Sequence, residues 1–327
     1  MDEINLQYTT IKNPVPDFIY DGIREFSAGA NTYKPQPDVL IEKLAKKHKV
    51  RNENIFLTAG ADEGIQMFAH AYGTNAFVFT PTYVVYSDVE TFGGKLTRID
   101  SVKGDKFSIS TNKIDGATLI YLANPNNPSG FTEKDDVVEL IKNNKDSVVV
   151  IDEAYGDYAP ELSVISQIGK YKNLAVLRSF SKGYQMAGNR VGYIVSTPKI
   201  IKSVKDFTQW ANVSYLSVGA AVVALDHEKY FKKMREEIAT RRGEFIAYLR
   251  NRDFTVFPSV INAVLIKFES EGIAQTFVDN LKENNIVVSY GNGNSNIGLD
   301  KSFVRISIGT DKQMKQLEGI IEKESSK

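Results

Sequence analysis

Lys182 has the surroundings best suited to chemistry in this sequence. It follows the apolar run LAVLR, Ser179 and Ser181 stand just before it, and Arg190 lies eight residues later. The serines offer hydroxyl donors, and the arginine can make paired, charge-assisted hydrogen bonds to the same anion. These residues predict a site where an amine lies beside a bound anionic group such as a phosphate.

Other polar clusters also follow apolar runs. Gly60, Ala61 and Asp62 come after the run NIFLT and open a helical pattern. The free backbone N–H groups at the start of a helix favour a phosphate. Further donors and acceptors stand at or just beyond the ends of predicted strands: Asn127, Asp152 and Tyr155.

The elements that would position these residues alternate between strands and helices. Short apolar runs rich in Val, Ile, Leu and Phe are followed by a polar cluster and a helix-like stretch, as in TLIYLANPNNPSG (118–130) and SVVVIDEAYGDY (147–158). Such runs are typical of strands buried on both faces, and the interleaved helices predict βαβ units with a mostly parallel sheet. Since ligands bind beyond the carboxyl ends of such strands, the polar clusters are expected to share one crevice.

Two parts of the chain depart from this alternation. Residues 1–30 are punctuated by two prolines and a glycine and are expected to be irregular. After a long helical stretch from Val218 to about Arg250, the order becomes strand, helix, strand, strand and helix, which is an α+β pattern. We therefore predict an α/β protein with a large domain over 31–230 and a smaller α+β domain, the latter formed by 231–327 together with an N-terminal arm, 1–30.

The composition argues against several classes of function. Lysine and arginine together number 40, as do aspartate and glutamate, so no overall charge attracts nucleic acid or an anionic membrane. The chain has no cysteine, which suits the reducing cytoplasm. Its acidic, polar start is unlike a signal peptide, and its longest apolar patch, near LSVGAAVVAL, is too short to span a bilayer. A globular, cytoplasmic protein is expected.

Six motifs, in order, carry a family resemblance: TAGADEGI, FTPTYVVY, ANPNNPSG, VIDEAYGDY, SFSKGYQMAGNRVGYI and FVRISIGT. This set resembles the fold-type I aminotransferases, which depend on pyridoxal phosphate, and within them the histidinol-phosphate aminotransferase branch. The resemblance covers nearly the whole chain. It implies that the large domain binds the cofactor, pyridoxal 5′-phosphate.

The resemblance also implies roles around the cofactor ring. Lys182 matches the Schiff-base lysine, which holds the cofactor and later shuttles a proton. Asp152 matches the carboxylate that faces the pyridine nitrogen, and a carboxylate there favours the protonated ring. Asn127 and Tyr155 match the donors to the ring hydroxyl group, and Tyr83 matches the aromatic residue that stacks on the ring.

Further matches concern the phosphate, the substrate and a partner subunit. The phosphate site would comprise Gly60, Ala61, Asp62, Ser179, Ser181 and Arg190. Arg305, with Asn127, matches the group that binds the substrate carboxylate, and Asn13 echoes a segment that covers the substrate. Tyr33 resembles the tyrosine that reaches the cofactor phosphate of the partner subunit, so a homodimer is implied.

Simpler interpretations exist for several of these residues. Asp152 and Glu153 could be a metal-binding pair, but neighbours on a strand point to opposite faces and no histidine lies nearby in sequence, so no metal is expected. Arg305 could belong to a surface ion pair. Tyr33 and Tyr83 could be packing residues, as most of the 16 tyrosines must be.

The chain departs from the branch in ways that bear on the substrate. Histidinol-phosphate enzymes tend to carry an arginine where this chain has Ser289 and Tyr290, and that arginine helps to hold the substrate phosphate. The N-terminal segment keeps only Asn13 and Pro14 of the expected NENP pattern, and the chain is short for the branch.

The leading prediction is a histidinol-phosphate aminotransferase-like enzyme that uses an amino donor and a 2-oxo acid, with 2-oxoglutarate as the usual acceptor. Three alternatives stay open at this point. One is an aminotransferase for an aromatic or other unphosphorylated amino acid, and another is a decarboxylase of a phosphorylated amino acid. The third is a cofactor-binding regulator without turnover, which the intact set of Lys182, Asp152 and Arg305 disfavours.

Overall fold

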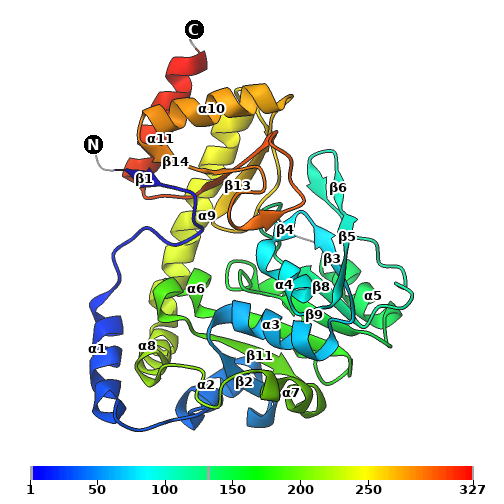
Figure 1. Ribbon diagram of the computed structural model, residues 1–327. Coiled ribbons are helices and arrows are strands. Elements are labelled where there is room, and N and C mark those ends of the chain that lie inside the picture. Colours follow the sequence, from blue (N-terminus) through cyan, green and yellow to red (C-terminus); the bar gives the residue numbers. More distant parts are fainter. Residues whose placement is uncertain (1–2, 131–132, 326–327) are drawn as a thin grey trace.

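The computed structural model describes residues 3–130 and 133–325. The outer ends of the predicted domain ranges, residues 1–2 and 326–327, and residues 131–132 lie outside this description. The largest sheet has seven strands in the order β2-β11-β10-β9-β8-β3-β5 (Figure 1). Their bounds are Ile55–Thr58, Gly192–Ser196, Leu174–Ser179, Val148–Asp152, Leu119–Ala123, Asn75–Thr80 and Lys95–Asp100.

This sheet is mostly parallel. Strand β11 runs antiparallel to both of its neighbours, while β10, β9, β8, β3 and β5 are parallel to one another. The prediction of an α/β fold with a mostly parallel sheet is therefore confirmed. The strands could be predicted from short apolar runs because both faces of the sheet are covered. In β8, for example, all five residues are buried.

Helices cover the sheet on both faces. On one face, Val150 packs in a core with residues of α3 (Gly60–Tyr72), α4 (Asp88–Thr91) and α7 (Pro198–Val204). On the other, Val149 and Ile151 belong to a core that includes residues of three further helices. These are α2 (Asp38–His48), α5 (Lys134–Asn143) and α8 (Tyr215–Asp226). Because side chains alternate along β9, successive residues of this strand pack into two separate cores on opposite faces of the sheet.

The C-terminal part forms a second, antiparallel sheet with the order β12-β13-β17-β15. Its strands are Thr255–Val256, Ala263–Lys267, Phe303–Ser307 and Ser289–Tyr290. Helices α10 (Glu271–Glu283) and α11 (Asp311–Ser325) accompany it, and α9 (Glu228–Arg250) connects it to the larger part (Figure 1). The predicted boundary near residue 231 falls in the first turn of α9.

The expectation of an irregular N-terminus is wrong for Asp17–Phe26, which form helix α1. Pro16 precedes the helix rather than breaking it, since a proline at a helix start has no N–H to lose. Gly22 permits close packing against α8, because a Cβ there would lie 2.8 Å from the carbonyl oxygen of Gly219. A composition that suggested a loop therefore marks a tight helix contact.

Two other expected elements are divided. The long helical stretch from Val218 to Arg250 breaks at His227 into α8 and α9. The run IVVSY forms two short strands, of which β14 (Ile286–Val287) pairs with the N-terminal β1 (Ile4–Asn5) and β15 joins the antiparallel sheet. No helix of residues 3–130 and 133–325 is long and apolar enough to cross a membrane.

A buried ion network supports the strands that carry the site. Arg178, on β10, donates to Glu153 at 3.0 Å and to Asp157 at 2.6 Å. The arginine side chain is 4% exposed and that of Glu153 is 1% exposed. Although burial opposes it, the Arg178 guanidinium holds the pKa of Asp157 well below its usual range. Each buried charge in this network is therefore stabilised by the opposite charges beside it.

We expect Arg178→Met to lower the free energy of unfolding by about 3 kcal/mol, because Glu153 loses its cation and Asp157 keeps only the longer contact with Lys47, at 3.4 Å. Urea unfolding followed by circular dichroism would measure the change. Arg51→Met is the control, since Arg51 pairs with Glu53 on the surface and should change stability by less than about 0.5 kcal/mol. A loss below about 1 kcal/mol for Arg178→Met would contradict the role given to this network.

Candidate active site

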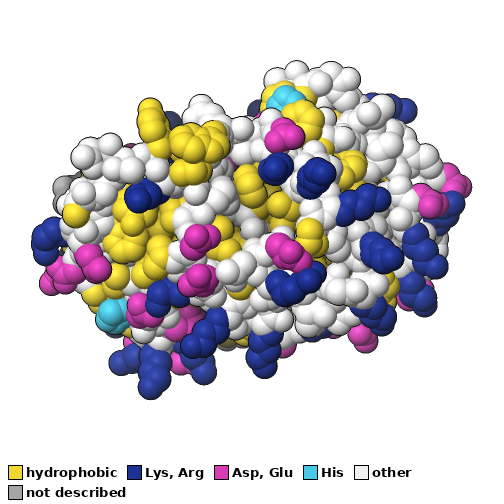
Figure 2. Space-filling model, turned by 90° about the horizontal axis from the view of Figure 1, so that it is seen from below, with side chains coloured by type: hydrophobic (Ala, Val, Ile, Leu, Met, Phe, Trp, Pro, Cys, Tyr) yellow, Lys and Arg dark blue, Asp and Glu magenta, His cyan; other side chains and the backbone are white. Residues whose placement is uncertain are grey.

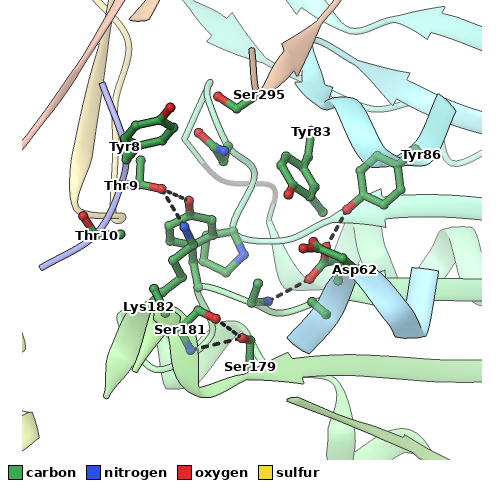
Figure 3. A pocket seen from close by; sticks show the side chains of 18 of the residues that line it. Tyr8, Thr9, Thr10, Asp62, Tyr83, Tyr86, Ser179, Ser181, Lys182 and Ser295 are labelled. Carbon is green, nitrogen blue, oxygen red and sulfur yellow. Dashed lines mark hydrogen bonds between the residues drawn. The ribbon is translucent and has the colours of Figure 1, made fainter. Parts of the chain in front are cut away.

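A cavity of about 290 Å³ lies at the carboxyl ends of the large sheet's strands (Figure 3). Asp152 ends β9, and the register places it beside Ala123 of β8 and Leu177 of β10. Parallel strands thus bring together side chains from distant parts of the chain. The predicted residues that line the cavity are Ala61, Asp62, Tyr83, Asn127, Asp152, Tyr155, Ser179, Ser181, Lys182, Arg190 and Arg305.

One end of the cavity offers donors to an anion. Ser179 caps the short helix α6 (Phe180–Gly183), accepting a hydrogen bond from the Ser181 N–H and donating to Ser181 Oγ at 2.9 Å. Arg190 donates to the Asp62 carboxylate at 2.7 Å, which fixes the guanidinium beside the start of α3. Gly60 has φ +83°, and a Cβ there would lie 2.6 Å from Arg190 Nη2. Glycine at this position therefore leaves room for the guanidinium.

Asp152 provides a buried carboxylate on the cavity wall. Its Oδ2 accepts a hydrogen bond of 2.7 Å from Tyr86, and its Oδ1 accepts one of 2.9 Å from the Ala154 N–H. Burial raises the pKa of Asp152 to about 6, although both hydrogen bonds act in the opposite direction. The carboxylate is thus ready to accept a proton or a charged N–H donor from a ligand.

Lys182 projects into the same space. Its Nζ donates to Thr9 Oγ1 at 2.8 Å and lies 5.4 Å from the centre of the Tyr155 ring. Thr9 Oγ1 also shares a hydrogen bond of 2.6 Å with the Tyr155 hydroxyl (Figure 3). An amine, a phenol and an alcohol are therefore in direct contact inside the cavity.

Arg305, on β17, brings a cation to the other side of the cavity. Its side chain is 2% exposed, and its Nη1 donates to Asn127 at 2.9 Å and to Asn296 at 3.2 Å. Its Nη2 donates to the Gln7 carbonyl oxygen, while Nε has no hydrogen-bond partner. Burial lowers the pKa of Arg305, which is the sign of a cation that lacks sufficient negative charge around it.

Three predicted residues do not line the cavity. The Asn13 backbone carbonyl accepts a hydrogen bond from the Gln185 side chain, and its own side chain does not line the cavity. Tyr33 is 79% exposed, and its ring centre lies 5.8 Å from that of Trp210. Gly60 supports the cavity through the backbone rather than by lining it.

The cavity is also lined by residues with polar side-chain groups that sequence analysis missed: Tyr8, Thr9, Thr10, Tyr86, Asn294 and Ser295. Tyr86 lies in the motif FTPTYVVY, three residues after Tyr83, so its place in a recognised motif was a signal. The N-terminal residues carried no such signal, because their neighbours in the fold are more than 140 positions away in the sequence. Within residues 3–130 and 133–325, no group of three or more His, Cys, Asp or Glu residues is placed to hold a metal ion.

Ser289 is one of the two residues, with Tyr290, that stand where the resemblance predicts an arginine. It lies directly across from Arg305 in the β15–β17 pair, is buried, and its Oγ has no hydrogen-bond partner. An arginine at this position would have placed a second cation next to Arg305. The chain therefore presents one guanidinium here, not two.

The family model described as "Aminotransferase class I and II" matches residues 5–321. The chain belongs to this family. The aminotransferases of this family use pyridoxal phosphate to move an amino group between an amino donor and a 2-oxo acid, so this chain is a pyridoxal-phosphate-dependent aminotransferase. The resemblance found in the six motifs is thereby confirmed.

Relatives and solved structures agree with the family. The histidinol-phosphate aminotransferase of Methanocaldococcus jannaschii is 31% identical over 301 residues, covering 88% of this chain and 80% of that protein. The solved structure of histidinol-phosphate aminotransferase from Clostridium acetobutylicum has a TM-score of 0.90 at 24% identity, covering 99% of both chains. That of L-threonine-O-3-phosphate decarboxylase from Porphyromonas gingivalis has a TM-score of 0.85 at 25% identity, covering 99% of this chain and 100% of that one.

The residues of this aminotransferase fit pyridoxal phosphate. Hydroxyl, guanidinium and free helix N–H groups at one end suit its phosphate, and the buried carboxylate of Asp152 suits a protonated ring nitrogen. Lys182, which lines the same cavity, would supply an amine for its aldehyde. Because Gly60 has no Cβ, the guanidinium of Arg190 has room to lie among these phosphate donors.

Proposed function

We propose that this aminotransferase acts on histidinol phosphate as amino donor, with 2-oxoglutarate as acceptor. The observation that carries the proposal is Arg305, a buried guanidinium on the cavity wall that has only neutral partners among the described residues. A buried cation without an anion is unfavourable, so such a site favours an anionic substrate. The names of the similar proteins support a phosphate as one such anion.

The proposed roles follow from where the side chains lie. Bound pyridoxal phosphate supplies an electron sink for the substrate carbon that loses its proton. Lys182 Nζ would hold the cofactor and then carry that proton, since Lys182 lines the cavity. Asp152 would keep the ring nitrogen protonated, Tyr155 would donate to the ring hydroxyl group, and Tyr83 would pack against the ring.

The remaining residues would hold the two anions. The phosphate of the cofactor would be bound by Ser179, Ser181, Arg190 and the backbone around Gly60, Ala61 and Asp62. Arg305 and Asn127 would bind the phosphate of the donor and the α-carboxylate of the acceptor in turn. The site would then have two anion positions in the cavity that Lys182 also lines.

We propose that Lys12 assists in binding the substrate anion, in place of the arginine expected where this chain has Ser289 and Tyr290. Its Nζ donates to the Tyr8 carbonyl oxygen at 3.2 Å and to Thr10 Oγ1 at 3.0 Å, and both residues line the cavity. Burial, with a smaller effect of Lys182, lowers the pKa of Lys12. An anionic substrate group near this ammonium would raise the pKa of Lys12 again.

We also propose a cytoplasmic homodimer in which Tyr33 completes the site of the partner subunit. The lower side of the molecule, where α1, α2, α7 and α8 lie in Figure 1, displays a group of hydrophobic side chains in Figure 2. Exposed aromatic residues include Tyr33 and Trp210, the latter 69% exposed. Exposed groups of this kind are typical of protein interfaces.

The substrate proposal can be tested by half-reactions. Purified holoenzyme is mixed with histidinol phosphate, or separately with phenylalanine, without any oxo acid, and its visible absorbance is followed. Conversion to the pyridoxamine phosphate form with histidinol phosphate alone is the expected result. Conversion with phenylalanine alone would overturn the substrate and would favour an unphosphorylated donor.

A second candidate activity is decarboxylation of a phosphorylated amino acid. It is suggested by the likeness to the solved structure of L-threonine-O-3-phosphate decarboxylase, which covers 99% of this chain and 100% of that one. The same experiment with threonine phosphate distinguishes decarboxylation from transamination. Release of carbon dioxide without formation of pyridoxamine phosphate would support this activity over the first.

A further inference from the structure

Thr9 contacts both the reactive amine and the phenol of the site. Lys182 Nζ donates to its Oγ1 at 2.8 Å, and Tyr155 Oη lies 2.6 Å from the same atom. The threonine is 4% exposed, so water does not compete freely for these hydrogen bonds. Figure 3 marks the hydrogen bonds of this hydroxyl with dashed lines.

The backbone fixes the position of this hydroxyl. Asn262 Nδ2, which is fully buried, donates to the Thr9 carbonyl oxygen at 3.0 Å. Two residues earlier, the Gln7 carbonyl oxygen accepts from Arg305, and the Leu6 carbonyl oxygen accepts from the Ser307 N–H at 3.0 Å. The segment that carries Thr9 is therefore attached to the strand that carries the substrate-binding arginine.

We propose that Thr9 is a positioning residue for Lys182. A hydroxyl oxygen can accept an N–H from the amine in either protonation state, ammonium or neutral. When the amine is neutral, one N–H directed at Thr9 leaves the nitrogen lone pair free to point elsewhere in the cavity. Thr9 thus selects the orientation in which Lys182 reacts with the cofactor aldehyde and accepts a proton from the substrate.

The contact of Thr9 with Tyr155 also positions the phenol relative to the Lys182 amine. Since Thr9 Oγ1 touches both the amine and the phenol, the two groups are held at a fixed separation by one atom. Because the threonine is anchored beside Arg305, binding of an anion there is coupled to the direction of the amine through only a few backbone bonds. The inference rests on the proposed role of Lys182 but not on the identity of the amino donor.

Three variants test the proposal. Thr9→Val keeps the shape and removes the hydroxyl, and Thr9→Ser keeps the hydroxyl. Thr118→Val is the control, since Thr118 Oγ1 also makes several hydrogen bonds but at the opposite end of β8. The first readout is the rate at which visible absorbance appears when pyridoxal phosphate is added to each cofactor-free protein, measured as a function of pH. The second is kcat and KM for the holoenzyme.

We expect Thr9→Val to slow cofactor capture about tenfold, to shift the pH at which capture is half-maximal, and to lower kcat about tenfold with little change in KM. Thr9→Ser should stay within about threefold of the parent in both rates. Equal losses for Thr9→Val and Thr9→Ser, or capture by Thr9→Val at the parent's rate at every pH, would overturn the proposal. If Thr9→Val does not fold, Thr9→Ala carries the same expectation. Absence of visible absorbance in the parent would instead refute the role of Lys182 itself.

Discussion

A Lys182→Ala variant is expected to transfer amino groups at least about 10⁴-fold more slowly than the parent while it keeps its fold. Loss of a positioned acid–base group alone lowers rates by about 10²- to 10⁴-fold, and the covalent attachment of the cofactor proposed for this lysine would be lost as well. The folded state loses little, because the partly buried side chain gives up one hydrogen bond, to Thr9, and its contact with the Tyr155 ring. Single-turnover kinetics with a saturating donor would measure the rate.

The same variant should still bind pyridoxal phosphate, because the phosphate donors remain. Binding would be seen by equilibrium dialysis, without the visible absorbance of the lysine-bound cofactor. The exposed Lys199→Ala, at the start of α7, is the control and should match the parent in rate and absorbance. Turnover by Lys182→Ala within tenfold of the parent would exclude Lys182 as the proton carrier.

The strand ends of the large sheet could be predicted because they depend on local sequence. The five residues of β8 and most of β9 are apolar, so their burial on both faces was visible in the sequence. A parallel sheet then brings the residues after each strand together. For this reason Asp152, Ser179 and Lys182, which lie on neighbouring strands or just after them, line one cavity.

The N-terminal wall of the cavity could not be predicted in this way. Thr9 reaches Lys182 across 173 positions, and its place is determined by hydrogen bonds with Asn262, far along the chain. Nothing in the sequence around Thr9 indicates those partners. The helix α1 was hidden for a similar reason, since Gly22 marks a close approach to Gly219 that only the folded chain reveals.

Tyr86 could be predicted only in part from the sequence. Its motif was recognised, but among 16 tyrosines nothing identified it as the donor to Asp152. Because its hydroxyl is fully buried, it needs a hydrogen-bond partner, and the carboxylate at the end of β9 is within 2.7 Å. Burial, and then the nearby Asp152 charge, raise the pKa of Tyr86, so it stays a donor at neutral pH.

Asp152→Asn should have opposite effects on stability and activity. Burial raises the pKa of Asp152 to about 6 from an ordinary value of 3.8. The folded, cofactor-free protein therefore binds a proton more tightly than the unfolded chain, and this group's contribution to stability falls as pH rises from about 4 to about 6. Above that range, the ionised carboxylate destabilises the cofactor-free fold by about 3 kcal/mol.

Asparagine has the same shape without the charge, so the variant should be as stable as the parent near pH 4 and more stable above pH 6, by at most about 3 kcal/mol. Its turnover should fall about 10³-fold, because the ring nitrogen loses its anionic partner. Urea unfolding of the cofactor-free proteins at several pH values, with single-turnover kinetics of the holoenzymes, would measure both effects.

Asp157→Asn provides the matched control for the sign of the pH effect. The charge of Arg178 outweighs burial and holds the pKa of Asp157 well below its usual range, so its ionised form stabilises the fold. Its contribution is present above the ordinary carboxyl pKa and is lost as pH falls through the lowered value. Asp157→Asn should therefore become less stable than the parent at neutral pH, whereas Asp152→Asn becomes more stable. Parallel pH trends in the two variants would contradict the electrostatic account of Asp152, and turnover by Asp152→Asn within tenfold of the parent would remove its role at the ring nitrogen.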